Sequence, residues 1–517
     1  MNATAFKDWL TWREQGFNSL PVWYKRSLNH EDRPSSWESA WKAASAHAFV
    51  LESGKDGRYT YLGLHPSSVI RGKGMIAEAV DSASSSITRY DYKPLEAVRS
   101  WMSAYKAPRV PDVPKFTGGC VGFWSYDVIR SIERIPNHAA DDLGLPDYLF
   151  LRMDELWVID HQEKMLYCVR HSLIEADSSE EQLFAQYEET CALTEKMSHF
   201  WTELTRSDEL RNSRMDFMES SSLHIDVEAI GGITSPFQKE AYQSAVERIR
   251  DYIAQGDVFQ VNLSMRQTRA VTTPPEELYE WLRLVNPSPY MGFLRCPDFQ
   301  LVSGSPELLV ELQGGKLATR PIAGTRRRGR TEEEDRQMAD ELLGNEKERA
   351  EHIMLVDLER NDLGRISAYG SVHVEELMVI EYYSHVMHLV SQVEGTLAPG
   401  KDAYDVIEAT FPGGTITGAP KIRTMEIIEE LEPVRRGPYT GSMGWIDYNG
   451  DMEFNIIIRT MTVKDHQVHI QAGAGIVIDS KPEREYYESL SKAKALWKSI
   501  QYSEQWAKTE RMLANHE

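Results

Sequence analysis

The chain has 517 residues, of which 41% are hydrophobic and 10% aromatic, and its formal net charge is −22 at pH 7. This composition can bury a sizeable core, so it excludes an intrinsically disordered protein. The charge argues against general binding to nucleic acids or anionic membranes, because both are polyanions. An anionic substrate would therefore need cations placed locally around its site.

The cysteines and the first residues indicate a cytoplasmic protein. Cys120, Cys168, Cys191 and Cys296 form no CxxC pair and lie at no zinc-ligand spacing, which is typical of reduced thiols. The N-terminal segment lacks the basic and apolar regions of a signal peptide. No apolar run reaches the roughly 20 residues that span a bilayer.

Composition divides the chain into four segments. We expect an N-terminal domain at residues 1–206, a polar connector at 207–235, a larger catalytic domain at 236–500 and a C-terminal tail at 501–517. In the first domain, short β-rich runs alternate with turns, and a helix is predicted near residues 180–205. The connector reads as irregular chain with at most a short strand.

Helices and strands are mixed irregularly in the second half. Ser235 and Pro236 predict a helix start, and Gly256 predicts its end. Strands are predicted at 258–264, 292–295, 301–304, 308–312, 442–446, 453–463 and 468–478, and helices at 331–357, 402–410, 422–432 and 481–497. Without regular βαβ alternation, this order indicates an α+β fold with large antiparallel sheets.

Two pairs of glutamates have the same helical spacing. Glu348 and Glu351 lie one turn apart on a predicted helix, as do Glu485 and Glu488 near the C-terminus. Four carboxylates from two helices could hold a hard cation such as Mg²⁺. The alternative is that each pair is solvated, as such pairs usually are.

The arginines offer candidate anion sites. Residues 326–330 contain the densest basic cluster, which is a carboxylate site, a solvated loop, or a loop with salt bridges to Glu332 to Glu334. Arg459 lies in an otherwise apolar run and is costly to bury without a partner. It is either one half of a core ion pair or an anchor for a substrate carboxylate.

Glycine-rich turns and isolated polar residues complete the candidates. The runs 411–421 and 471–475 could let backbone amides approach an anion, although tight turns are the usual explanation. Glu307 follows a predicted strand and is either a general acid or a surface carboxylate. His388 lies among apolar residues, where a hydrogen-bonded core histidine is the commoner role.

As an ordered set, these motifs resemble the chorismate-utilising enzymes, the family of anthranilate synthase and aminodeoxychorismate synthase components I. The motifs are Gly304-Ser-Pro-Glu307, Pro321-Ile-Ala-Gly-Thr325, Glu348-x-x-Glu-His352, Leu355-Val-Asp-Leu-x-Arg-Asn-Asp362, Pro412-x-Gly-Thr-x-Thr-Gly-Ala-Pro-Lys421, Ile458-Arg-Thr460 and Ala472-Gly-Ala-Gly475. The resemblance implies two large antiparallel sheets packed as a sandwich with helices outside.

The resemblance also assigns roles to individual residues. It implies Mg²⁺ as cofactor, with Glu351 and Glu488 as direct ligands and Glu348 and Glu485 reaching the ion through water. Chorismate would be the substrate, and Glu307 would protonate or orient its departing hydroxyl. The remaining pocket residues would be Gly324, Thr325, His388, Thr415, Tyr439, Arg459, Gly473, Ala474, Gly475 and Lys492.

The branch within the family follows from three further positions. Gln260 stands where water-activating branches carry a lysine base, which favours ammonia as nucleophile. Asn262 resembles the aminodeoxychorismate branch, and the runs 441–448 and 454–460 resemble its Gram-positive members. Ala323 resembles anthranilate synthases, because many aminodeoxychorismate synthases have a nucleophilic lysine there. We expect amination to 4-amino-4-deoxychorismate, in the synthesis of 4-aminobenzoate and folate, with anthranilate synthesis as the alternative.

Partners and effectors are also implied. The chain has no plausible glutaminase triad, so a separate glutamine amidotransferase subunit would supply ammonia in a heterodimer. Ser53, Pro289, Tyr290 and Met291 resemble the family's tryptophan pocket. A scaffold with an inert site is the non-enzymatic alternative, against which the retained acids and Arg459 argue.

Overall fold

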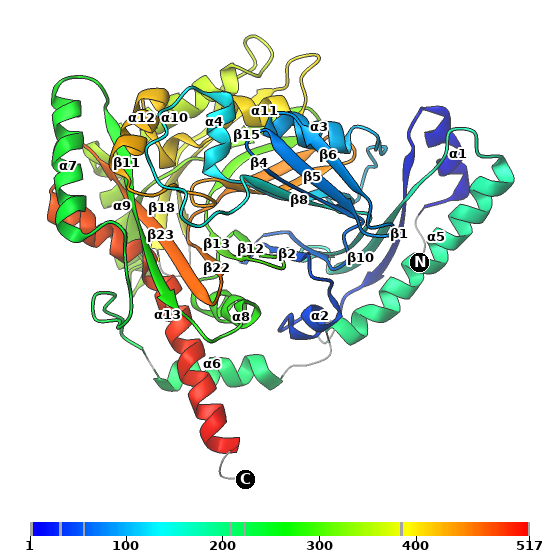
Figure 1. Ribbon diagram of the computed structural model, residues 1–517, viewed down its shortest axis with the longest axis horizontal. Coiled ribbons are helices and arrows are strands. Elements are labelled where there is room, and N and C mark those ends of the chain that lie inside the picture. Colours follow the sequence, from blue (N-terminus) through cyan, green and yellow to red (C-terminus); the bar gives the residue numbers. More distant parts are fainter. Residues whose placement is uncertain are drawn as a thin grey trace.

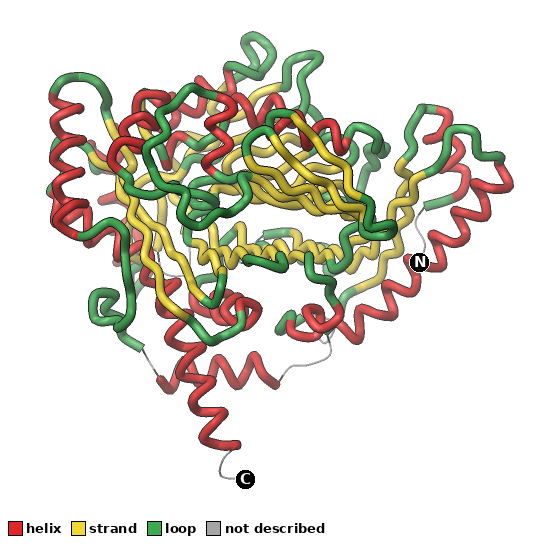
Figure 2. Tube along the Cα trace, in the orientation of Figure 1, coloured by secondary structure: helices red, strands yellow, loops and turns green. Residues whose placement is uncertain are grey.

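The computed structural model describes residues 4–29, 34–54, 57–205, 209–221, 223–382 and 386–514. Two large antiparallel sheets run through the centre of the molecule (Figures 1 and 2). In the described ranges, the eleven-stranded sheet has the order β1 (Ser19–Ser27), β10 (Met165–Leu173), β9 (Glu155–Asp160), β3 (Tyr59–Gly63), β2 (Ala48–Glu52), β12 (Tyr290–Arg295), β13 (Gln300–Ser305), β22 (Thr460–Lys464), β23 (Gln467–Ile476), β11 (Gln260–Ala270) and β19 (Gly418–Ala419).

The second sheet has twelve strands within the same ranges. Its order is β16 (Ile322–Arg327), β18 (Val386–Thr396), β15 (Lys316–Thr319), β14 (Leu308–Gln313), β21 (Met452–Ile456), β20 (Ser442–Asp447), β7 (Gly119–Trp124), β8 (Tyr148–Met153), β4 (Ser68–Lys73), β5 (Ile76–Asp81) and β6 (Ile87–Asp91), with β17 (His373–Tyr382) paired to β18.

Helices flank the sheets. They are α1 (Phe6–Glu14), α2 (Glu38–Ala43), α3 (Pro94–Met102), α4 (Ile129–Ile132), α5 (Glu180–Leu204), α6 (Glu209–Ser221), α7 (Lys239–Ala254), α8 (Pro275–Val285), α9 (Glu332–Gly344), α10 (Glu346–Gly364), α11 (Ala403–Thr410), α12 (Lys421–Leu431) and α13 (Pro482–Ala514). Single 3₁₀ turns occur at η2 (Tyr126–Val128) and η3 (Gly414–Ile416). No helix in the described ranges is long and apolar enough to cross a membrane.

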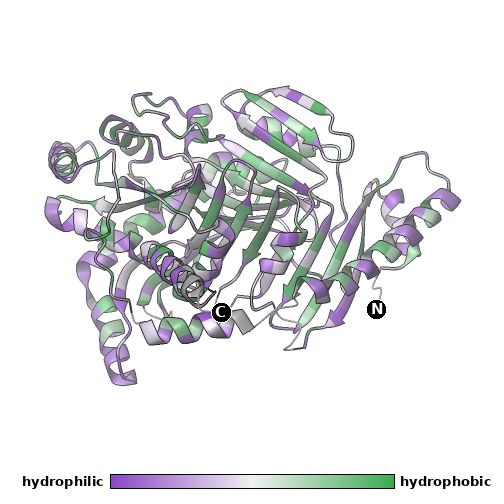
Figure 3. Ribbon diagram, turned by 60° about the horizontal axis from the view of Figure 1, so that its bottom comes forward, coloured by the Kyte–Doolittle hydropathy of each residue, from purple (hydrophilic) through white to green (hydrophobic). Residues whose placement is uncertain are grey.

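Alternation along the strands produces the layers. In β7, Val121 and Phe123 join the core between the sheets, whereas Cys120 and Trp124 join the core beneath α3 and α11. The eleven-stranded sheet buries its other face against α5, α7, α8 and α13. Strands are accordingly largely hydrophobic and the flanking helices mixed (Figure 3). The α+β sandwich with outer helices is therefore confirmed.

The two halves of the chain share both sheets. Strand β2 pairs with β12, and β7 pairs with β20, so the connector at 207–235 does not separate two sheets. The connector also contains α6, contrary to its prediction as irregular chain. Phe217 of α6 packs against the rings of Trp281, Tyr502 and Trp506, a tertiary contact that local composition does not reveal.

Four predicted boundaries were wrong. Helix α7 begins at Lys239, because the Ser235 hydroxyl accepts a hydrogen bond from the Phe237 amide and forms a local turn. The predicted helix 331–357 is two helices, since Asn345 caps α10 by accepting from the Glu348 amide at 3.1 Å. The predicted helix 481–497 does not end before the predicted tail, because helix α13 continues through the tail to Ala514.

The fourth error concerns the run 453–463, which was predicted as one strand. It forms β21 in one sheet and β22 in the other. Arg459 lies between them with φ of +51°, a conformation that ends an extended strand. The chain therefore crosses between the sheets at the arginine that was assigned to the substrate.

Candidate active site

Glu307 lies between β13 and β14 and is 6% exposed. Burial raises the pKa of its carboxyl to about 7, although the Thr415 hydroxyl and the Ile322 amide lower it. Glu307 Oε1 and Thr415 Oγ1 are both buried, and among the described residues neither atom makes a hydrogen bond of regular geometry. Glu307 is therefore a buried acid that still holds a proton near neutral pH and has a free oxygen, as a general acid requires.

Arg459 has no acidic partner among the described residues. Burial lowers the pKa of its guanidinium, and the neighbouring Tyr439 raises it. Its backbone is fixed, since its carbonyl accepts a hydrogen bond from the Gly304 amide at 3.0 Å. The core ion pair considered from sequence is absent in this part of the chain, which leaves a cation suited to a ligand carboxylate.

Glu351, on α10, faces the start of β11. Gln260 Nε2 donates to Glu351 Oε1 at 3.2 Å. Burial and the adjacent Glu348 raise the pKa of Glu351. Gln260 Oε1 itself is buried without a partner in the described residues. Gln260 was treated only as a branch marker in the sequence, and the structure adds it to the site.

Lys492 links the two glutamate pairs. Its ammonium lies 3.1 Å from Glu488 Oε1 and donates to the Gly473 carbonyl at 2.9 Å. The same charge lowers the pKa values of Glu307, Glu351 and Glu485. Groups on α10, on α13 and in the β13–β14 turn therefore all feel the charge of one lysine.

Strand β16, which precedes α9, contributes a second wall. His388 Nδ1 lies 3.0 Å from Thr325 Oγ1, and burial lowers the pKa of His388 to about 4, so the imidazole is neutral. Gly324 has φ of +60°, and a Cβ there would lie 3.0 Å from Glu348 Oε2. Glycine thus lets strand β16 approach the Glu348 carboxylate closely.

Two glycines of β23 make room for side chains of β11. A Cβ on Gly475 would lie 2.3 Å from Gln260 Nε2, and one on Gly473 would lie 2.8 Å from Asn262 Oδ1. Ala474 between them is fully buried. Asn262 Oδ1 has no hydrogen-bond partner among the described residues. The glycine run thus forms a polar wall here rather than a tight turn.

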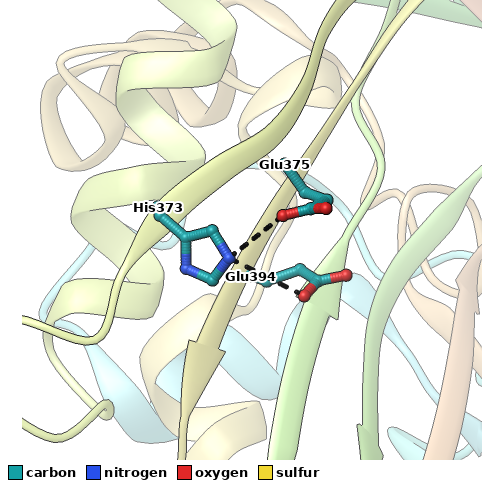
Figure 4. A group of neighbouring side chains, drawn as sticks. All are labelled: His373, Glu375 and Glu394. Carbon is teal, nitrogen blue, oxygen red and sulfur yellow. Dashed lines mark ion pairs between the residues drawn. The ribbon is translucent and has the colours of Figure 1, made fainter.

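The predicted metal ligands suit a hard cation by donor type, since all four are carboxylates. No three of these four carboxylates have ligand atoms within 4.8 Å of one another. Among the described residues, the one group of three such side chains with ligand atoms within 4.8 Å is His373, Glu375 and Glu394 on β17 and β18 (Figure 4). Glu394 lies six residues beyond His388 on the same strand, so this group, with His373 and Glu375 exposed and Glu394 half-buried, is separate from the predicted metal ligands.

The arginine cluster at 326–330 pairs largely with nearby acids. Arg326 lies 3.2 Å from Glu348 and 3.3 Å from Glu341. Arg328 pairs with Asp335 of α9. These two arginines are therefore ion-paired, but with acids other than the predicted Glu332 to Glu334, and Arg326 offsets the charge of Glu348.

The four predicted effector residues lie together. Ser53, Pro289, Tyr290 and Met291 line a cavity of about 1230 Å³ between the sheets. The cavity also contacts Pro306, next to Glu307. This large cavity is therefore separate from the predicted catalytic residues but borders them.

Comparison with known proteins identifies the family of the chain. A family model described as "chorismate binding enzyme" matches residues 47–498. Aminodeoxychorismate synthase component 1 of Bacillus subtilis (strain 168) is 48% identical over 462 residues, covering 89% of this chain and 93% of the relative. Anthranilate synthase component 1 of Thermus thermophilus is 44% identical over 469 residues, covering 88% and 93%.

A solved structure shows the same fold. Anthranilate synthase component I from Streptococcus pneumoniae TIGR4 superposes with a TM-score of 0.68 at 34% identity, covering 85% of this chain and 92% of that chain. The family match spans most of the chain and includes every predicted catalytic, substrate and metal residue. The protein therefore belongs to the chorismate-binding enzyme family and is an enzyme that uses chorismate.

Proposed function

We propose that the enzyme aminates chorismate with ammonia to give 4-amino-4-deoxychorismate. The observation that carries the proposal is Arg459, a partly buried guanidinium with no acid beside it in the described chain. It would bind the enolpyruvyl carboxylate together with Tyr439, helped by the amides of Gly473, Ala474 and Gly475. One carboxylate of a dicarboxylic substrate would supply the negatively charged partner that Arg459 lacks.

The carboxylates would hold Mg²⁺, which neutralises the ring carboxylate of the substrate when it is bound. Glu351 and Glu488 would be direct ligands, and Glu348 and Glu485 would act through water. Burial raises the pKa values of Glu351 and Glu485. These side chains thus bear a desolvation cost that a divalent cation would relieve.

Glu307 would give its proton to the departing C4 hydroxyl. Its raised pKa and free Oε1 suit that role, with Thr415 and Lys492 beside it. His388 is neutral and hydrogen-bonded to Thr325, so it would orient the pocket rather than supply charge. Gly324 and Thr325 would line the pocket next to it.

Ammonia is the proposed nucleophile. Gln260, which occupies the place of the lysine base of water-activating branches, pairs with Glu351 and cannot accept a proton as an amine would. Both relatives named above are called component 1, which supports a second subunit. That partner would be a glutamine amidotransferase that releases ammonia at the site.

The product branch rests on finer features. The Bacillus relative and Asn262 favour aminodeoxychorismate. Ala323 is buried on β16 and offers no nucleophile, so ammonia would attack the ring directly. Ala323 and the cavity at Ser53 and Tyr290 favour anthranilate synthesis as the second candidate.

The deciding experiment supplies the protein with chorismate, Mg²⁺ and ammonium and identifies the product. We expect an aminated product that yields 4-aminobenzoate only after a separate lyase is added. Fluorescent anthranilate as the main product would overturn the branch, and inhibition of turnover by tryptophan would point the same way. No consumption of chorismate would reject the proposed function as a whole.

A further inference from the structure

A buried acid lies behind the proposed site at a position that the family motif leaves open. Glu359, on α10 two turns beyond Glu351, is 4% exposed. Its neighbours on the helix, Val356 and Leu363, belong to the core beneath the twelve-stranded sheet. No ion pair joins Glu359 to a cation among the described residues. Burying a carboxyl group in such surroundings costs free energy unless the group is hydrogen-bonded.

Thr319 Oγ1 contacts two oxygens, each of which could accept its single hydrogen. Thr319 Oγ1 lies 2.9 Å from the Leu309 carbonyl oxygen and 3.1 Å from Glu359 Oε2. A hydroxyl has one hydrogen, and a carbonyl can only accept it. Both contacts are fully satisfied when Thr319 donates to Leu309 and Glu359 carries a proton that it donates to Thr319 Oγ1.

The charges around Glu359 lead to the same state. Burial, the nearby Asp362 and Glu307 raise its pKa to about 8, against the opposing effects of Lys421 and of the hydrogen bond with Thr319. Lys421 is engaged elsewhere, since it pairs with Asp362 and donates to the Thr410 carbonyl at 3.2 Å. Lys421 therefore pairs with Asp362 rather than with Glu359, which favours the protonated form of Glu359.

Glu359 touches two elements that carry the proposed chemistry. Through Thr319 it reaches Leu309, two residues after Glu307 on β14. Its Oε1 would lie 3.6 Å from a Cβ built on Gly414, the residue before Thr415. That Cβ would come within 2.2 Å of Leu358, so glycine is required for α10 to pack this closely on the turn.

We propose that Glu359 is a positioning residue that remains protonated, donates through Thr319 to the Leu309 carbonyl, and supports Glu307 and Thr415 without adding a negative charge behind them. The protonation of Glu359 follows from its own surroundings, and only its effect on turnover rests on the proposed function. A charged Glu359 would oppose ionisation of Glu307 and so hold it protonated to higher pH.

The first test needs no substrate and compares the wild type with Glu359→Gln, which keeps the shape and a donor but cannot titrate. An acid whose pKa is raised on folding stabilises the folded state least at high pH. Between the unfolded pKa of 4.5 and about 8, unfolding of the wild type releases one more proton than unfolding of the variant. The ratio of their unfolding constants should therefore change about tenfold per pH unit from pH 5.5 to 7.5. A ratio independent of pH would overturn the proposal.

A second readout uses infrared spectra of the folded proteins at pH 7. The carbonyl band of an un-ionised carboxylic acid should be present in the wild type and reduced in Glu359→Gln. Thr319→Val removes the acceptor hydroxyl and should shift that band. If Glu359→Gln does not fold, the shift in Thr319→Val alone decides, and an unmoved band refutes the hydrogen bond.

The third readout is the pH profile of turnover. If Glu359 is neutral, the pH at which turnover falls as Glu307 ionises should shift by no more than about 0.3 pH unit in Glu359→Gln. Glu359→Leu removes the hydrogen bond to Thr319 and should lower kcat about tenfold. A limb that moves to lower pH in Glu359→Gln would show that the native group is charged. Lack of any chorismate turnover would reject the proposed function while leaving the unfolding and infrared results intact.

Discussion

The ammonium of Lys492 lies 3.1 Å from the Glu488 carboxylate, so a cation already stands beside a proposed metal ligand. The pair lies one turn apart on α13, and Lys492 also donates to the Gly473 carbonyl. A divalent ion at Glu488 must therefore share that carboxylate with the ammonium or displace it. This competition leads to a prediction about metal affinity.

Lys492→Met should tighten Mg²⁺ binding in the absence of substrate by about two- to fivefold, because it removes a competing, partly exposed cation. The same change should lower turnover, since Lys492 is placed in the pocket. Isothermal titration with Mg²⁺ measures the affinity. Lys494→Met, on the same helix, is the matched control, and equal or weaker Mg²⁺ binding by Lys492→Met would contradict the competition.

Glu351→Gln should abolish Mg²⁺-dependent turnover, because an amide cannot replace a charged ligand at the proposed ion. The stabilisation that Mg²⁺ gives in a thermal melt should disappear with it. Glu346→Gln is the control, since Glu346 is an exposed acid at the start of α10. A fully active Glu351→Gln enzyme would reject the metal assignment, and loss of activity in both variants would point to damage of the helix.

Turnover should fall as pH rises through about 7 if Glu307 acts as the general acid. Burial raises the pKa of Glu307 to about 7, and the protonated form is the one that donates. Glu307→Gln should lower kcat by about 10²- to 10⁴-fold and remove that limb. Steady-state kinetics across pH 5.5–8.5 measures both effects, and an unchanged limb in the variant would assign it to another group.

Arg459→Lys should raise the KM for chorismate by about 10- to 100-fold, because a lysine cannot hold a carboxylate in two parallel hydrogen bonds. The change should have little effect on folding, since the guanidinium has no acid partner in the described chain. Arg360→Lys is the control at a half-exposed ion pair. An unaltered KM would remove Arg459 from the substrate site.

Arg436→Met should destabilise the protein by about 3–5 kcal/mol, because it leaves the buried Glu432 charge without its partner. Arg436 donates to Glu432 at 2.7 Å and to the carbonyls of Ile416 and Asn262 at 2.9 and 2.7 Å. It thereby fixes the turn that carries Thr415 against β11. Denaturant unfolding measures the loss, and the double variant with Glu432→Gln should recover part of it.

Much of the secondary structure was predictable because it depends on local pattern. Helix α5 and strands β12 to β14 lie close to their predicted ranges, since apolar periodicity and flanking turns define such elements. The wrongly predicted elements are those whose conformation depends on a contact with residues far away in the sequence. Helix α6 forms because Phe217 packs against Trp281 and two rings of α13, a contact that its polar sequence does not show.

The sequence by itself determined the residue types of the site, because motif spacing preserves chemistry. It indicated the family, the paired glutamates and the unusual Arg459. Only the tertiary structure decided whether Arg459 had an acid partner, whether Glu307 was buried, and that Glu359 lay behind it. The physical reason is that desolvation and ion pairing depend on segments far apart in the chain, which are brought together only by packing of the two sheets.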